Sequence, residues 1–209
     1  MKSLSLSKPL VLITIGIPGS GKSFFASQFS ETFNAPVVSY DKLRHTLFSD
    51  NGFAKQEQDL VNTIANIELE ELLKTQKTFI IDGAVASKIQ RMEIRKKAQQ
   101  AGYDTLLIWV QTDKNTAKYR SMKRSSRRSD DKYNSSLSSE QYDQLEKRFV
   151  IPQPTEAAVV ISGKHTYATQ AKVVLKKLVT PRAQAAQSIV NHDGRTPDAS
   201  APRRNVIIR

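Results

Sequence analysis

A glycine-rich run near the start of the chain has residue types and a spacing that suit anion binding. It reads Gly16-Ile-Pro-Gly-Ser-Gly-Lys-Ser23 and fits the pattern G-x-x-x-x-G-K-[ST]. Glycines at this spacing let the main chain curl so that successive N–H groups point inward at a phosphate. The run therefore predicts a phosphate-binding loop with nucleotide contacts from Gly16, Pro18, Gly19, Ser20, Gly21, Lys22, Ser23 and Phe24.

The last two residues of this loop have separate expected tasks. Lys22 would bridge the β- and γ-phosphate oxygens of ATP and neutralise the charge that grows on them during transfer. The Ser23 hydroxyl would bind Mg²⁺, which prefers oxygen ligands. A glycine-rich turn with an incidental Lys-Ser is the alternative, but the apolar run before the loop and the helical pattern after it argue against that reading. A dinucleotide-binding fold is disfavoured because its G-x-G-x-x-G spacing is missing.

An acidic and a basic residue, Asp41 and Arg44, follow the second apolar run, Pro36–Tyr40. An aspartate at the carboxyl end of a strand, facing the γ-phosphate, can accept the proton of an attacking hydroxyl, so Asp41 is a candidate general base. Arg44 lies one helical turn later, where it would hold the acceptor. The structural alternatives are that Asp41 caps a helix beginning at Lys42 and that Arg44 lies on a solvated helix face.

Asp82 is a third acidic candidate, at the end of the apolar run Thr78–Ile81. Its carboxylate would orient a Mg²⁺-bound water or form an ion pair with Arg44. The structural alternative is an aspartate that starts a turn at a strand end. The sequence has no cysteine and its three histidines are not spaced as metal ligands, so any metal is expected to be held by oxygen.

A basic, serine-rich segment over about residues 120–137 is typical of a mobile lid, because it follows a helical pattern and holds few apolar residues. Arg120 and Arg124 lie four residues apart, so they are expected to share one helix face. From that face they would close over the polyphosphate and stabilise the charge of the transition state, as arginine fingers do. Neighbouring Arg127 and Arg128 are interpreted as ordinary surface charge.

The elements that must position these residues alternate along the chain. Short apolar runs predict strands at about residues 9–15, 36–40, 78–82, 105–110 and 157–161. Helical patterns cover about 22–32, 56–74 and 87–101, and others begin at about 114, 138 and 166. This alternation predicts an α/β fold in three layers, α/β/α, with a five-stranded parallel sheet, the first strand central, and a helical lid. Ligands then bind at the carboxyl ends of the strands.

The length of 209 residues favours one domain, residues 1–180, followed by a disordered basic tail over residues 181–209. Residues 1–111 hold 13 Lys and Arg against 11 Asp and Glu, whereas residues 112–209 hold 19 against 9. A basic second half suits a polyanionic partner such as nucleic acid, although a solubilising surface explains it equally well. The sequence has neither a membrane-spanning apolar run nor a signal peptide, so a cytoplasmic protein is expected.

The motifs quoted above resemble those of the polynucleotide kinase-like P-loop kinases, ATP-binding kinases of the AAA_33 type. The 5′-hydroxyl nucleic-acid kinases among them carry G-x-P-G-S-G-K-[ST] and then D-x-x-R, as this chain does at residues 16–23 and 41–44. The resemblance spans roughly residues 10–162, and it includes the R-x-x-x-R pair of Arg120 and Arg124. After Asp82 the family has Thr or Ser and a further polar residue, where this chain has Gly83 and Ala84.

This resemblance implies an ATP-dependent kinase whose catalytic residues are Lys22, Asp41, Arg44 and Arg124, with Ser23 and Asp82 at the Mg²⁺. It also implies a polynucleotide 5′-hydroxyl as the acceptor. The alternatives are a small-molecule, sugar or toxin-like kinase of the same fold, because one phosphate cradle serves many hydroxyls. An RNA-binding ATPase without a dedicated acceptor belongs to a different class, and loss of Asp41 would separate it from a kinase.

Overall fold

The structure is a computed structural model that describes residues 8–48, 54–83, 86–125 and 132–179. The expected basic tail, residues 181–209, lies outside the described residues, and so do Ala84, Arg127 and Arg128 and the rest of the central part of the expected lid. The chain divides into two units, Met1–Leu178 and Val179–Arg209, and the fold is that of the first.

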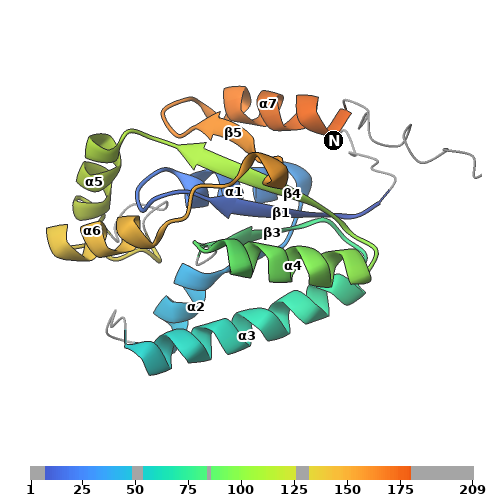
Figure 1. The fold of residues 1–209 in the computed structure, drawn as a ribbon, viewed down its shortest axis with the longest axis horizontal. Coiled ribbons are helices and arrows are strands. Elements are labelled where there is room, and N and C mark those ends of the chain that lie inside the picture. Colours follow the sequence, from blue (N-terminus) through green and yellow to red (C-terminus); the bar gives the residue numbers. More distant parts are fainter. Residues whose placement is uncertain (1–7, 49–53, 84–85, 126–131, 180–209) are drawn as a thin grey trace, which may run out of the picture. The chain divides into compact units, whose positions relative to one another are not determined.

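Five parallel strands form one sheet in the order β2-β3-β1-β4-β5. Their bounds are β1 Leu10–Ile15, β2 Val37–Ser39, β3 Phe79–Asp82, β4 Asp104–Gln111 and β5 Val159–Ser162. The strand β1 is central, as expected, and pairs with β3 on one side and β4 on the other. Figure 1 shows the strands pointing toward the end of the sheet where α5 and α6 lie. The carboxyl ends that hold the candidate site are at this end.

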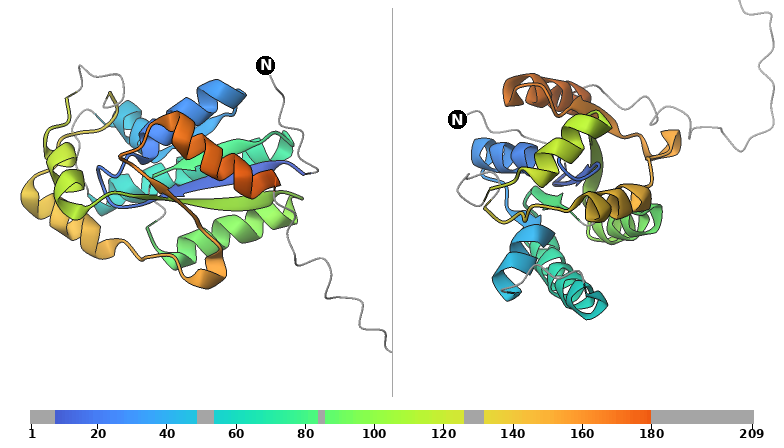
Figure 2. Two further views of the ribbon diagram at one scale, coloured as in Figure 1. Left: turned by 90° about the horizontal axis from the view of Figure 1, so that it is seen from above. Right: turned by 90° about the vertical axis from the view of Figure 1, so that its left-hand side faces the viewer.

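Helices connect the strands and cover both faces of the sheet (Figures 1 and 2). Their bounds are α1 Lys22–Phe33, α2 Tyr40–Leu47, α3 Lys55–Lys74, α4 Lys88–Gln100, α5 Lys114–Met122, α6 Ser139–Arg148 and α7 Tyr167–Val179, with a short 3₁₀ helix at Pro154–Glu156. Most of these elements begin and end within one or two residues of the bounds expected from sequence. Ser87 and Ser138 are the N-caps of α4 and α6, each in a capping box with the Gln three residues later.

The central strand explains why there are three layers. All six of its side chains are buried, and successive side chains of a strand point to opposite faces. Val11 and Ile13 join a core that includes Val61 and Leu69 of α3 and Ile94 and Ala98 of α4. Leu10 and Leu12 join a second core, with Phe25 and Phe29 of α1 and Val174 of α7. A strand that is apolar on both faces needs helices on both sides, and the expected α/β/α architecture is confirmed.

Two helix ends differ from the expectations. The helix α2 begins at Tyr40 because the hydroxyl of Ser39 accepts the N–H of Lys42 at 3.3 Å, so Ser39 is the N-cap. Asp41 lies within the first helical turn, and its interpretation as the capping residue is wrong.

Within the described residues, no helix has the length and apolar content needed to cross a bilayer.

The helix α5 ends at Met122, before Arg124. The N–H of Leu137, returning from the lid, bonds the Ser121 carbonyl at 3.1 Å, and a longer helix would use that carbonyl itself. Arg124 therefore lies beyond the helix, and the expectation that it shares a helix face with Arg120 is wrong.

Candidate active site

The glycines of the loop between β1 and α1 are required by the packing around them. Gly16, Gly19 and Gly21 have φ values of 150°, 74° and 105°, a positive range that favours glycine. A Cβ at Gly16 would lie 2.5 Å from the Val110 carbonyl oxygen, and one at Gly19 would overlap the Ala117 carbonyl oxygen of α5. The loop is thus held between the end of β4 and the helix α5.

The helix that follows the loop begins without a capping side chain. Its N-cap is Gly21, and its first turn contains no acidic residue. By contrast, the N-cap side chains of α2, α4, α5 and α6 each accept a backbone N–H, and these caps are Ser39, Ser87, Asp113 and Ser138. The first N–H groups of a helix need partners and carry the positive end of its dipole. The start of α1 therefore fits a phosphate group.

Lys22 lies in the first turn of α1 and folds back over the loop. Its Nζ donates to the carbonyl oxygens of Gly16 and Ile17, at 3.0 Å each. Burial lowers the pKa of Lys22, while the nearby carboxylates of Asp82 and Asp41 raise it. The ammonium thus bonds the loop carbonyls within the electrostatic reach of two carboxylates, one at the end of β3 and one in the first turn of α2.

Asp82 lies at the end of β3, paired in register with Thr14 of β1. Its side chain is almost fully buried and accepts the Thr14 hydroxyl at 2.9 Å. Burial raises the pKa of Asp82, and hydrogen bonds from Ser23 and Thr14 and the charge of Lys22 lower it. The contact between Ser23 and Asp82 joins the two residues expected at Mg²⁺. The alternative pairing of Asp82 with Arg44 stays a prediction.

This donor set fits a magnesium ion that shares its coordination with a nucleotide. No cluster of three or more Asp, Glu or His side chains able to hold a metal occurs in the described part of the chain. Mg²⁺ is commonly bound by one or two protein groups together with substrate phosphates and water. Ser23 and Asp82, next to the loop, match that pattern.

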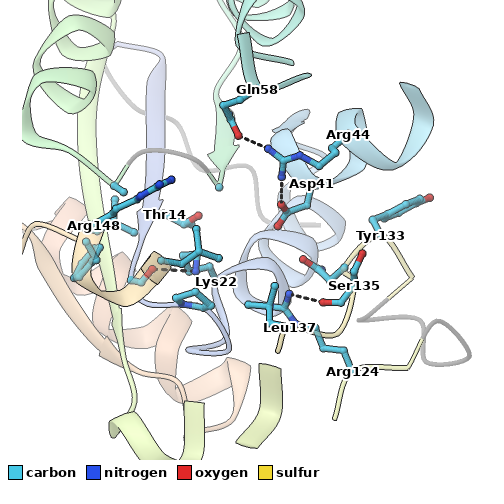
Figure 3. A pocket seen from close by; sticks show the side chains of 18 of the residues that line it. Thr14, Lys22, Asp41, Arg44, Gln58, Arg124, Tyr133, Ser135, Leu137 and Arg148 are labelled. Carbon is cyan, nitrogen blue, oxygen red and sulfur yellow. Dashed lines mark hydrogen bonds and ion pairs between the residues drawn. The ribbon is translucent and has the colours of Figure 1, made fainter. Parts of the chain in front are cut away.

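Asp41 and Arg44 lie on the first two turns of α2 and form an ion pair of 3.6 Å. Arg44 is largely buried and also donates to the Gln58 side chain of α3, whereas the Asp41 side chain is 38% exposed. Figure 3 shows Arg44 between Gln58 and Asp41. The aspartate is therefore both fixed by a cation and accessible to a ligand.

A cavity of about 500 Å³ brings these residues together (Figure 3). All four expected catalytic residues line it: Lys22, Asp41, Arg44 and Arg124. Gly16 and Pro18 contribute the edge of the loop. The other lining residues come from β1, from the segment after β3, from α3 and α6, and from the lid: Thr14, Ile15, Lys55, Gln58, Gly83, Ala86, Tyr133, Asn134, Ser135, Leu137, Leu145, Arg148 and Phe149.

Arg120 and Arg124 lie at different places. The Arg124 guanidinium donates to the Ser135 carbonyl at 3.3 Å and lines the cavity. Arg120 donates to the Gly163 carbonyl at 2.9 Å, after β5. That connection packs against the loop, because a Cβ at Gly163 would overlap the Ser20 carbonyl oxygen. Phe24 is partly exposed at the start of α1. Arg120 and Phe24 are absent from the cavity lining but lie close to the loop in sequence or structure.

Several lining residues were missed by sequence reasoning. Gln58 and Lys55 lie at the start of α3, and Arg148 is the last residue of α6. Polar residues at helix ends are common, so their sequence positions carry no signal of a site. The lining holds the cations Lys22, Arg44, Lys55, Arg124 and Arg148 against the single carboxylate of Asp41. Such a cavity favours an anionic ligand.

The model of one protein family matches much of the chain. The AAA_33 family, described as an AAA domain, matches residues 11–152, which is more than half of the sequence. No curated protein matches the chain in a sequence search.

Solved structures with the same fold include several nucleotide-binding proteins. The APS kinase CysC of Mycobacterium tuberculosis, in complex with AMPPNP and APS, has a TM-score of 0.60 and 18% identity, over 83% of this chain and 99% of that chain. Kti12 of Chaetomium thermophilum, in complex with ADP-AlF3, has a TM-score of 0.59 and 18% identity, over 81% of this chain and 97% of that chain. A chain of the Pnkp1/Rnl/Hen1 RNA repair complex has a TM-score of 0.57 and 21% identity, over 69% of this chain and 45% of that chain. At these identities the likeness shows a P-loop kinase fold.

Proposed function

Since this chain belongs to the AAA_33 family, we propose that it is an ATP-dependent kinase that transfers the γ-phosphoryl group of ATP to a hydroxyl acceptor. The observation that carries the proposal is a single cavity lined by Lys22 of the phosphate-binding loop and by the Asp41–Arg44 pair of α2. A cation beside the transferred group and a base on the far side of it are the minimum that in-line transfer to a hydroxyl requires.

The loop and the start of α1 bind the polyphosphate. Backbone N–H groups from Gly19 to Ser23 form the cradle, and Lys22 exchanges its bonds to the loop carbonyls for bonds to phosphate oxygens. Ser23 and Asp82 would hold Mg²⁺, which would supply positive charge to the phosphate oxygens. The Asp82 carboxylate is fixed before the reaction by its hydrogen bonds from Thr14 and Ser23, and that preorganisation lowers the cost of stabilising the new charge.

Asp41 takes the proton of the attacking hydroxyl. Its partial exposure lets an acceptor approach, while the ion pair with Arg44 orients the carboxylate. Arg44 in turn is held by Gln58, so the pair has a fixed direction toward the cavity (Figure 3). General-base catalysis of this kind contributes about 10²- to 10⁴-fold in rate. Arg124 closes the cavity from the lid side, and Arg120 braces the lid against the loop after β5.

The acceptor that we propose first is a polynucleotide 5′-hydroxyl. The excess of cations over carboxylates in the cavity and the net charge of +12 support a polyanionic acceptor. So does the D-x-x-R at Asp41–Arg44. The likeness to a chain of an RNA repair complex agrees with this proposal.

A second candidate is a small phosphorylated or sugar-like hydroxyl compound. The cavity of about 500 Å³ has the size of a site for one small ligand. The likeness to a kinase solved with APS agrees with this candidate.

The test is a transfer assay with γ-labelled ATP, Mg²⁺ and a panel of 5′-hydroxyl RNA, 5′-hydroxyl DNA, nucleosides and sugars. Label in an oligonucleotide supports the first candidate, and label in a small compound alone supports the second. Release of labelled phosphate to water with every acceptor unlabelled would contradict the kinase proposal and favour an ATPase.

A further inference from the structure

Arg148 is a cation of the cavity wall to which the proposed transfer step gives no role. It is the last residue of α6, where the negative end of the helix dipole favours a cation. Its side chain is exposed, lines the cavity and forms no ion pair with any described residue. Figure 3 shows it entering the cavity from the side opposite Tyr133.

The other cations of the lining, apart from Lys55, already have partners in the described structure. Arg44 pairs with Asp41 and Gln58, Arg124 donates to a lid carbonyl, and Lys22 donates to the loop. Two lysines of α5 pair with acids of α6, Lys114 with Glu146 at 3.1 Å and Lys118 with Asp143 at 2.9 Å. Arg148 is thus available for a ligand in a way that these cations are not.

The chain that follows Arg148 is fixed by a buried ion pair. Arg91 of α4 donates from Nε and Nη2 to the two carboxylate oxygens of Glu156, at 2.6 and 3.0 Å. Both side chains are more than nine-tenths buried. Each end is thus charge-compensated, and the geometry is that of a bidentate guanidinium–carboxylate pair, the most directional ion pair in proteins.

The same guanidinium joins two segments of the cavity wall. Its Nη1 donates to the carbonyl oxygens of Ala86 and Val150, at 3.1 Å each. The Val150 N–H bonds Ala86 as well, at 3.0 Å. Ala86 and Phe149 both line the cavity, and Phe149 also packs against Trp109 of the sheet. Arg91 therefore sets where α6 ends and where Arg148 enters the cavity.

We propose that Arg148 binds a phosphate group of the acceptor other than the one being transferred, and that the Arg91–Glu156 pair is a positioning device for it. This inference rests on the proposed function. It makes the substrate a hydroxyl compound that carries its own phosphate, which in a polynucleotide is an internucleotide phosphate near the reacting end. Arg44 and Arg148, on different walls, would then hold the acceptor from two sides of Asp41.

The test is a binding cycle that does not need transfer. Fluorescent 5′-hydroxyl oligonucleotides are prepared with a phosphate or a neutral methylphosphonate at the first or the second linkage. Each is titrated into the wild type, Arg148→Gln and Lys147→Gln, the last a matched neighbour on the exposed side of α6. Arg148→Gln should weaken binding of the phosphate form about tenfold or more, because a charged hydrogen bond is lost. It should hardly change the binding of the oligonucleotide whose methylphosphonate replaces the phosphate that Arg148 contacts.

Equal losses for the phosphate and methylphosphonate forms at both linkages would overturn the proposal, as would equal effects of the two variants. A sugar phosphate and its neutral sugar, used as competitors, distinguish a small acceptor from a polynucleotide. If Arg148→Gln weakens the binding of the sugar phosphate but of no oligonucleotide, Arg148 still binds a phosphate and the acceptor is the small compound. If binding shows the coupling but no compound accepts phosphate from ATP, the kinase proposal fails and the Arg148 site stands.

The positioning role is tested with Arg91→Lys, which keeps the buried charge but loses the bidentate geometry. It is assayed under conditions where circular dichroism shows a folded protein. The expected result is a KM for the phosphate-bearing acceptor raised about tenfold at little-changed kcat. In the Arg91→Lys background, Arg148→Gln should also cause a smaller loss of affinity for the phosphate form. A lower kcat at unchanged KM, from a smaller active fraction, would contradict the positioning role.

Discussion

Gly19 is the loop residue whose replacement the structure forbids most clearly. It combines a φ of 74° with a position against the Ala117 carbonyl of α5. Gly19→Ala should therefore lower the free energy of unfolding by about 2 kcal/mol or more, through left-handed strain and overpacking. It should also weaken ATP binding. Urea unfolding and ATP titration measure the two effects.

Gly102→Ala is the matched control for Gly19→Ala. Gly102 has a φ of 83°, but a Cβ there would meet no atom within 4 Å. Its replacement should cost only the strain of about 1–2 kcal/mol and leave ATP binding as it is. Equal effects of the two variants on ATP affinity would contradict the close packing of the loop against α5.

Ser23 provides a test of the metal site. Its hydroxyl contacts the buried carboxylate of Asp82, and together they are the proposed protein contribution to Mg²⁺ binding. Ser23→Ala should raise the Mg²⁺ concentration for half-maximal activity by about tenfold or more. Ser27→Ala, one turn further along α1 and exposed, should leave it as it is. A Mg²⁺ requirement that is the same in both variants would remove Ser23 from the metal site.

Residues that act through local geometry were accessible to sequence reasoning, and residues brought together by the fold were not. The phosphate loop depends on spacing within eight residues, and Asp41 and Arg44 depend on one helical turn. Arg148 reaches the cavity because Arg91, paired with Glu156, fixes the chain just after α6. No local pattern signals that arrangement.

At the scale of elements, the strands were predictable because each is a short apolar run between turn residues. The three-layer sheet follows from a first strand buried on both faces. The errors lie at helix ends, where a single hydrogen bond decides. Ser39 moves the start of α2, and the returning Leu137 ends α5. Contacts of this kind, the second between residues far apart in sequence, cannot be read from periodicity.

The buried ion pair of Arg91 in α4 and Glu156 before β5 is expected to make the largest contribution to stability on this side of the sheet. Arg91→Met would leave the Glu156 carboxylate buried without its partner, and removing one member of a buried pair costs about 3–5 kcal/mol. Chemical denaturation measures the loss. A second change, Glu156→Leu, should restore part of it, because a buried apolar pair avoids the unpaired charge. A double variant less stable than Arg91→Met would contradict this account.

The same pair gives the wild type a pH dependence. Hydrogen bonding to Arg91 lowers the pKa of Glu156 below its ordinary value of 4.5. A carboxyl group whose pKa is lower in the folded state adds stability above pH 4.5, and this contribution is lost as pH falls through the folded pKa. Denaturation curves between pH 7 and pH 3 should therefore show a loss in the wild type that is smaller in the Arg91→Met/Glu156→Leu variant. Parallel pH profiles would exclude Glu156 as a source of acid sensitivity.

For the whole molecule, charge separates the two candidate acceptors. The net charge is +12, and the cavity adds its own excess of cations. With an oligonucleotide acceptor, log(kcat/KM) should fall linearly with log[salt], with a slope of about −0.7 for each phosphate contacted. A small acceptor with one phosphate should give a much shallower slope, and a neutral sugar should give almost none. A flat salt profile with an oligonucleotide that nevertheless accepts phosphate would contradict charge-based recognition.

The central claim is that Asp41 activates an acceptor hydroxyl opposite a nucleotide held by the loop. The most direct measurement compares Asp41→Asn with the wild type for γ-phosphoryl transfer and for ATP affinity, with Asp59→Asn of α3, an exposed aspartate, as the control. The expected result is a transfer rate about 10²- to 10⁴-fold lower in Asp41→Asn alone, with ATP affinity within a few-fold of the wild type. Wild-type transfer by Asp41→Asn, or its loss only together with ATP binding, would contradict the claim.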